Sequence, residues 1–299
     1  MVLAFVNIAL ARLTKINSCE YKILLKPEKF QDRAAAFRAI WDTVKIFAHE
    51  LGIEVVEAND PFKEYRQEVI FYDTDSFDLR KRNYILRMRR KYDGDKPRGD
   101  YELTLKYCSN VLEESQKADV TPAFGYRTKS KFEEAILIAK DSLGSIRSIY
   151  SKSAKVKKID YKLSGKLEDF ARFFPVLSKL GLPSDAVLKP VNGVIIDERK
   201  SSPGMLKFGD NINGMVDITV WYLKGDTTHP LVAEFSYDCK IRDYDNMSKD
   251  AAEKCNEFFK KLQLRMADWV YLGATKTDTV FKYKKEKNDV LGSEKDQST

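Results

Sequence analysis

Histidine and cysteine are scarce in this chain of 299 residues, and their scarcity narrows the chemistry that it can perform. Only two histidines are present, which excludes a histidine-rich metal site. The four cysteines are far apart in sequence and form no C-x-x-C pair for zinc or thiol exchange: Cys19, Cys108, Cys239 and Cys255. Separated thiols are typical of a protein that is kept reduced, so we expect a cytoplasmic location.

Glycine-rich phosphate loops and long apolar runs are missing as well. Neither G-x-x-x-x-G-K-[ST] nor G-x-G-x-x-G occurs, which argues against the two common phosphate-binding loops. No apolar run approaches the roughly 20 residues that a membrane-spanning helix needs, so we expect no membrane partner. The apolar stretch 1–11 is short and no basic residue precedes it, so we interpret it as a packed segment rather than a signal peptide.

Charged and apolar residues are both plentiful. Hydrophobic residues make up 43% of the chain, enough for a sizeable core, and 52 Lys and Arg against 45 Asp and Glu give a net charge of +7. Such an excess suits a polyanionic ligand but is also common in ordinary proteins. With no internal repeat or linker, we expect one α+β domain over 17–273, between an apolar segment at 1–16 and a polar tail at 274–299.

The predicted helices and strands alternate along the chain. Apolar residues every three or four positions predict a helix from Pro27 to Gly52, and a second over 167–180 that Pro175 would kink. A closing helix follows Ser248, its expected N-cap. We also predict helix at 131–139 and leave 142–158 unassigned. The predicted strands cover 20–25, 68–72, 85–91, 101–107, 124–129, 187–198, 215–223 and 231–240.

Several predicted strands carry their charges on one face. Alternation places Arg87, Arg89 and Lys91 on the same side of one strand, and Glu102 and Lys106 on the same side of the next. One interpretation is a sheet with a solvated face, which is common. The other is a closed sheet whose charged interior binds a polyanion together with a metal ion, because unpaired charges are costly to bury.

Five motifs, in order, resemble the CYTH superfamily, the triphosphate tunnel metalloenzymes. They are Glu20-Tyr21-Lys22, Phe71-Tyr72-Asp73-Thr74 with Phe77-Asp78-Leu79, Leu86-Arg87-Met88-Arg89, Leu103-Thr104-Leu105-Lys106, and Ala233-Glu234-Phe235-Ser236. The resemblance implies an antiparallel β-sheet closed into a tunnel-like barrel with flanking helices. It also implies hydrolysis of an inorganic or organic triphosphate with Mg²⁺ or Mn²⁺.

Two motif glutamates of the family are replaced in this chain. Ser18 stands at the first position of the family's E-x-E-x-K pattern, and Ser236 at the second glutamate of its late E-x-E pattern. A hard divalent ion needs several carboxylate oxygens or waters, so the loss of two ligands should weaken metal binding. Asp238, on the same strand face as Ser236, is a candidate substitute.

The resemblance assigns roles to particular residues. It implies Glu20, Lys22 and Glu234 as catalytic, and metal binding by Glu20 and Glu234. Lys22, Arg87, Arg89 and Lys106 would bind phosphate. Alternation alone adds three weaker metal ligands, Asp238, Glu102 and Asp217. Lys189 and Arg199 are further candidate phosphate ligands, for which structural salt bridges are an equal explanation. Asp73 and Thr74 are at least as well explained as turn caps.

Three alternative functions stay open at this point. Ser18 and Ser236 suggest an inactive tunnel that binds polyphosphate or a nucleotide, and the resemblance also allows a class IV-type adenylyl cyclase. Seven basic residues within 80–91 suggest RNA binding. The interleaved carboxylates disfavour a nucleic-acid partner, because they would repel its phosphates.

Overall fold

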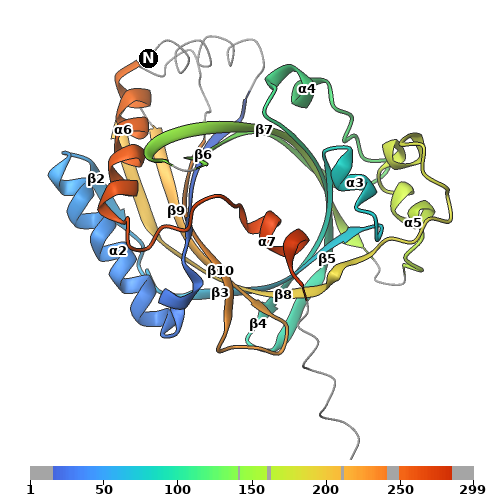
Figure 1. Ribbon diagram of the computed structural model, residues 1–299, viewed down its shortest axis with the longest axis horizontal. Coiled ribbons are helices and arrows are strands. Elements are labelled where there is room, and N and C mark those ends of the chain that lie inside the picture. Colours follow the sequence, from blue (N-terminus) through green and yellow to red (C-terminus); the bar gives the residue numbers. More distant parts are fainter. Residues whose placement is uncertain (1–15, 141, 160–162, 210–211, 241–248, 285–299) are drawn as a thin grey trace, which may run out of the picture.

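The strands form one closed ring. The computed structural model describes residues 16–140, 142–159, 163–209, 212–240 and 249–284. Strand β8 (Lys189–Gly209) pairs with β3 (Glu64–Asp73) on one side and with β9 (Ile212–Leu223) on the other, which closes a nine-stranded barrel (Figure 1). The ring continues from β3 through β4 (Tyr84–Asp93), β5 (Lys96–Ser109), β7 (Ser142–Ile159), β6 (Thr128–Ala139), β1 (Ser18–Leu25) and β10 (Pro230–Lys240) to β9.

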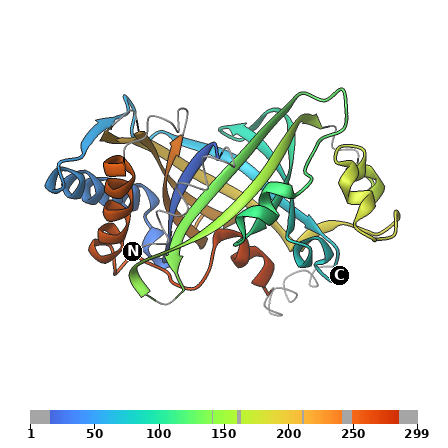
Figure 2. The same cartoon turned by 90° about the horizontal axis from the view of Figure 1, so that it is seen from above.

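The predicted tunnel-like barrel with flanking helices is therefore confirmed, with one difference in strand direction. Strands β1 and β6 run parallel, whereas the other pairs in the ring are antiparallel. A short strand, β2 (Glu54–Glu57), pairs with β8 outside the ring. In side view, strands cross the barrel obliquely (Figure 2), as closure of a twisted sheet requires.

Two long helices cover one side of the barrel. The helix predicted from Pro27 is two elements: a 3₁₀ turn, η1 (Pro27–Phe30), and α2 (Arg33–Glu50). Asp32 caps α2 by accepting a hydrogen bond from the amide of Ala35, and Gly52, at φ +65°, follows its end. With α6 (Lys249–Arg265), α2 packs on the outer faces of β1, β9 and β10 around a buried apolar core. The predicted inner face of α6 is confirmed: Ala251, Ala252, Cys255, Phe258, Phe259 and Leu262.

Smaller helices cover the opposite side. The helix predicted over 167–180 is divided into α5 (Leu167–Ala171) and the 3₁₀ turn η2 (Pro175–Lys179), because Pro175 cannot continue an α-helix. Their apolar residues pack on the outer faces of β3, β4, β5 and β7. Helices α3 (Asp78–Lys81) and α4 (Leu112–Lys117) follow β3 and β5.

The helix predicted at 131–139 is wrong. This segment lies in β6, with β7 on one side and β1 on the other; Glu133, for example, is opposite Ser151 and Ser18. The residue pattern is compatible with a helix, but pairing on both sides satisfies the backbone of β6 and overrides that local preference. The unassigned stretch 142–158 is its partner β7, and the strand predicted at 124–129 begins only at Thr128.

Helix α7 (Lys276–Lys282) lies inside the tail predicted over 274–299. Thr275 and Asp278 form a capping box at its start. Figure 1 shows α7 across the interior of the ring, and Figure 2 places it to one side of the strands. It packs through Val280 against an apolar cluster inside the barrel that includes Phe71, Ile85 and Trp221. Helix α7 thus covers this end of the tunnel.

Two predictions concern residues outside the described part of the chain, the apolar stretch 1–11 and the N-cap Ser248. Among the helices described, none combines the length and apolar character that a membrane crossing would require.

Candidate functional site

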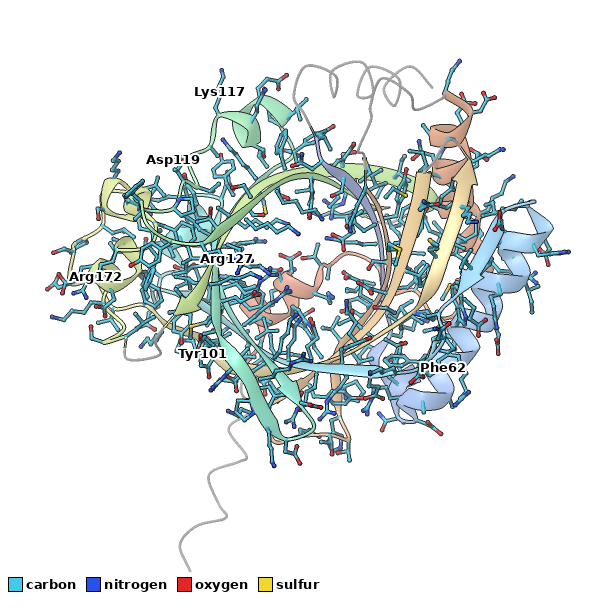
Figure 3. The ribbon with its side chains drawn as sticks, turned by 180° about the vertical axis from the view of Figure 1, so that it is seen from behind. Phe62, Tyr101, Lys117, Asp119, Arg127 and Arg172 are labelled. Atoms are coloured by element: carbon cyan, nitrogen blue, oxygen red, sulfur yellow. The ribbon has the colours of Figure 1, made fainter. Side chains whose placement is uncertain are left out.

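The interior of the barrel contains a cavity of about 670 Å³. Charged side chains from several β-strands and from α7 line it. Figure 3 shows side chains from the surrounding strands converging on this interior. Twelve lining residues are basic and four are acidic, an excess of eight positive charges. The basic residues are Lys22, Arg80, Arg87, Arg89, Lys106, Lys129, Lys131, Lys140, Arg147, Lys155, Lys276 and Lys282, and the acidic residues are Glu20, Glu133, Glu234 and Asp278.

Arg87 and Arg89 are two neighbouring inward-facing cations of the cavity wall. Both belong to β4, whose alternation directs them inward while Leu86 and Met88 pack in the outer core. Within the described part of the chain neither forms a salt bridge, and the Nε atom of each is buried without a hydrogen-bond partner. Burial, reinforced by the neighbouring Arg89, lowers the pKa of Arg87 to about 9. Two buried guanidinium groups with unused donors are a receptor for an anion.

A second cluster of cations surrounds Glu133 on β6. Its carboxylate lies 2.7 Å from Lys131, 3.1 Å from Lys106 and 3.9 Å from Lys22. Burial alone raises the pKa of Glu133, but the attraction of Lys106, Lys22 and Lys131 outweighs burial and holds that pKa well below its usual value. One carboxylate therefore holds three ammonium groups from three strands in the cavity wall.

Glu198 on β8, which is separated from β4 only by β3, offsets part of the positive charge of the arginines. It accepts a 2.6 Å hydrogen bond from Trp221 Nε1 and another from Gln67. Burial raises its pKa, but the charges of Arg89 and Lys276 and the hydrogen bonds lower the pKa to about 2. Glu198 is thus ionised at neutral pH.

The five predicted metal ligands are ion-paired with five different lysines. The pairs are Glu20–Lys22 at 2.7 Å, Glu234–Lys276 at 2.8 Å, Glu102–Lys155 at 2.8 Å, Asp217–Lys200 at 3.0 Å and Asp238–Lys131 at 3.4 Å. In the described ranges, no group of three or more acidic, histidine or cysteine side chains has the arrangement to hold a metal ion. The side chains as placed therefore do not fit a resident Mg²⁺ or Mn²⁺, and metal binding stays a prediction.

The predicted residues divide between the cavity and the outside. Glu20, Lys22, Arg87, Arg89, Lys106 and Glu234 line the cavity. Arg199 instead pairs with Asp197, 3.1 Å away, and Lys189 with Asp75, 2.8 Å away. These contacts favour the structural explanation for both. Asp238, Glu102 and Asp217 do not line the cavity. Asp238 and Glu102 contact it through Lys131 and Lys155, whereas Lys200, the partner of Asp217, does not line it either.

Asp73 and Thr74 build the turn before α3. The carboxylate of Asp73 accepts hydrogen bonds from the amides of Thr74, Leu79 and Arg80, and the hydroxyl of Thr74 accepts one from the amide of Asp78. The capping role is therefore the one that the structure supports.

The main residues that sequence reasoning missed lie on β6, β7 and α7. Lys129, Lys131, Glu133 and Lys155 alternate with period two, as the strands β6 and β7 require, but the first three fall near or within the segment interpreted as helix. Reading the same period in 129–133 and 153–157 would have found them. Nothing in the local sequence placed Lys276 in the site.

The basic run 80–91 does not form one surface. Arg80, Arg87 and Arg89 line the cavity, whereas Arg82 is at the end of α3 and Arg90 contacts the backbone of Gly99 on the outside. The run is thus divided between the cavity and the outer surface, and RNA binding stays an untested alternative.

Comparisons with known proteins find similar structures but no similar sequence or family. No protein-family model matches the chain, and no curated protein matches its sequence. A candidate adenylyl cyclase from Hippeastrum, described as having a dominant triphosphatase activity, is 12% identical with a TM-score of 0.42, covering 88% of this chain and 93% of its own. A candidate adenylate cyclase from Bacillus halodurans is 13% identical with a TM-score of 0.39, covering 89% and 98%.

A third solved structure is similar over the same extent. It is a candidate adenylate cyclase from Vibrio parahaemolyticus, 12% identical with a TM-score of 0.34, covering 88% of this chain and 97% of its own. The nine-stranded barrel is the fold that the CYTH resemblance implies.

Proposed function

We propose that the tunnel binds the phosphate chain of an inorganic or organic triphosphate. The observation that carries this proposal is the pair Arg87 and Arg89 in the cavity wall, whose buried Nε atoms have no hydrogen-bond partner and which form no salt bridge among the residues that the structure describes. Leaving a charged donor buried and unsatisfied is costly, and a phosphate oxygen removes that cost. Lys22, Lys106 and Lys131, held together by Glu133, supply further contacts for the neighbouring phosphoryl groups.

Hydrolysis of the bound triphosphate is a second candidate, favoured by Asp238 on β10. Within the described ranges its buried Oδ1 atom has no hydrogen-bond partner, while Oδ2 lies 3.4 Å from Lys131. Burial raises the pKa of Asp238, and Glu20 and Glu133 add to that effect against the opposing charge of Lys131. Asp238 lies behind the cavity lining and contacts it through Lys131, so as a base it would accept a proton from a water bound beside Lys131.

One substrate panel tests both proposals. Binding of tripolyphosphate, ATP and thiamine triphosphate is measured by calorimetry, and phosphate and cyclic AMP release by product analysis, with Mg²⁺, Mn²⁺ or EDTA. We expect binding of tripolyphosphate that Arg87→Ala weakens. Binding without phosphate release would indicate a tunnel that binds triphosphates and does not hydrolyse them. Release of cyclic AMP from ATP would indicate an adenylyl cyclase. No binding of any of the three compounds contradicts the proposed function.

A further inference from the structure

We infer that the tunnel holds its phosphate chain by direct contact with lysine and arginine, with no divalent metal ion on the tunnel carboxylates. The inference rests on the proposed function, because it concerns the same cavity. It departs from what the family resemblance implies, and its basis is the set of partners that the carboxylates already have.

Each carboxylate that would hold the metal has an ammonium group as its counter-ion. The clearest case is Glu234, whose side chain is 8% exposed and lies 2.8 Å from Lys276, itself 17% exposed. Lys276 also lies 5.1 Å from the centre of the Trp221 ring. A metal ion on Glu234 would displace this ammonium and leave it buried beside a dication, which is unfavourable in a poorly solvated cavity.

Glu20 is compensated in the same way at another height of the barrel. Its carboxylate lies 2.7 Å from Lys22. In the register of β1 and β10, Glu20 is opposite Asp238, whereas Glu234 is opposite Leu24. Four residues along a strand is about 13 Å, so Glu20 and Glu234 are fixed on separate lysines at separate levels.

The total charge of the cavity leads to the same inference. Its lining has eight more basic than acidic side chains, and Arg87 and Arg89 remain without an anionic contact in the described part of the chain. A phosphate chain supplies negative charge to this wall, whereas a resident dication would add to an excess of positive charge. Metal ions bridge phosphate to protein where the protein is acidic, and this wall is predominantly basic.

The first experiment compares tripolyphosphate binding to the full chain in EDTA and in excess Mg²⁺. We expect binding in EDTA, and no tighter binding in Mg²⁺, since Mg²⁺ competes for the free phosphate oxygens. Binding that occurs only with Mg²⁺ overturns the inference but leaves the proposed function standing. Absence of binding in both buffers contradicts the proposed function itself.

The second experiment uses substitutions that should raise the affinity for tripolyphosphate if the carboxylates only neutralise lysines, and lower it if they bind a metal ion. Glu234→Gln and Glu20→Gln keep the side-chain shape and release a lysine, so we expect tripolyphosphate affinity to rise by about fivefold in EDTA, the size of one partly exposed charge pair. Glu54→Gln, an exposed residue of β2 paired with Lys207, is the matched control and should leave the affinity unchanged. If either tunnel variant loses affinity in Mg²⁺ by tenfold or more, the carboxylates are metal ligands and the inference is wrong.

A direct metal titration completes the test. Mn²⁺ is added to the ligand-free chain and its binding is followed by electron paramagnetic resonance. We expect no saturable site at millimolar Mn²⁺. A saturable site that Glu234→Gln removes would overturn the inference.

Discussion

Lys276, on the last helix, places its ammonium 2.8 Å from the carboxylate of Glu234 on β10. The two residues are far apart in sequence, and the contact joins α7 to the wall of the tunnel. Through this contact, α7 supplies the counter-ion of a carboxylate that lines the cavity.

We expect Arg87→Ala and Arg89→Ala each to weaken tripolyphosphate binding by about thirtyfold or more, the range for truncating one side of a buried charged contact. The physical reason is the loss of guanidinium groups whose buried Nε atoms have no hydrogen-bond partner among the described residues. Arg199→Ala is the control, because Arg199 pairs with Asp197 away from the cavity. Calorimetric titration measures all three, and an equal loss for Arg199→Ala would contradict the assignment.

The lowered pKa of Glu198 predicts how the stability of the fold depends on pH. Its pKa in the folded chain is about 2, below the usual value of 4.5, so its ionised form stabilises the fold above about pH 4.5. That contribution, roughly 3 kcal/mol from the size of the shift, is lost as pH falls from 4.5 towards 2. Urea unfolding at pH 6 and pH 3 should show a smaller drop for Glu198→Gln than for the unaltered chain. Equal drops would mean that Glu198 is not held ionised.

Glu133→Gln should make the fold less stable and more dependent on an anion. Removing the carboxylate leaves Lys22, Lys106 and Lys131 facing one another, at a cost of about 3 kcal/mol for a buried pair that loses one partner. Tripolyphosphate should restore most of this loss, because it replaces the missing negative charge. Unfolding with and without tripolyphosphate measures the effect. Glu257→Gln, on an exposed pair of α6, is the control, and a Glu133→Gln loss that tripolyphosphate leaves unchanged would contradict the prediction.

Phe281→Ala should detach α7 from the end of the barrel. The Phe281 ring centre lies 5.3 Å from that of Phe77 and 6.4 Å from that of Phe71, and these contacts anchor the helix. We expect faster hydrogen exchange of the amides at 276–282 and weaker tripolyphosphate binding, because Lys276 and Lys282 line the cavity. Thr279→Ala is the control within the same helix. Unchanged exchange in Phe281→Ala would show that other contacts hold α7.

The sequence by itself determined the faces of the strands. Alternation placed Arg87, Arg89 and Lys106 opposite Leu86, Met88 and Leu105, and the structure directs the first set into the cavity and the second into the outer core. Period two is a local property of an extended chain, so it can be recognised from neighbouring residues alone. The motif resemblance added closure of the sheet, which the pairing of β8 with β9 confirms.

Only the tertiary structure decided which charges meet. Glu133 lies in a segment whose pattern also suits a helix, and pairing with both β7 and β1 makes it a strand that brings Lys22, Lys106 and Lys131 to one carboxylate. Lys276 comes from a stretch with no local signal, and packing of α7 on the apolar end of the barrel takes it to Glu234. The counter-ion of a buried charge depends on contacts distant in sequence, and no local period records such contacts.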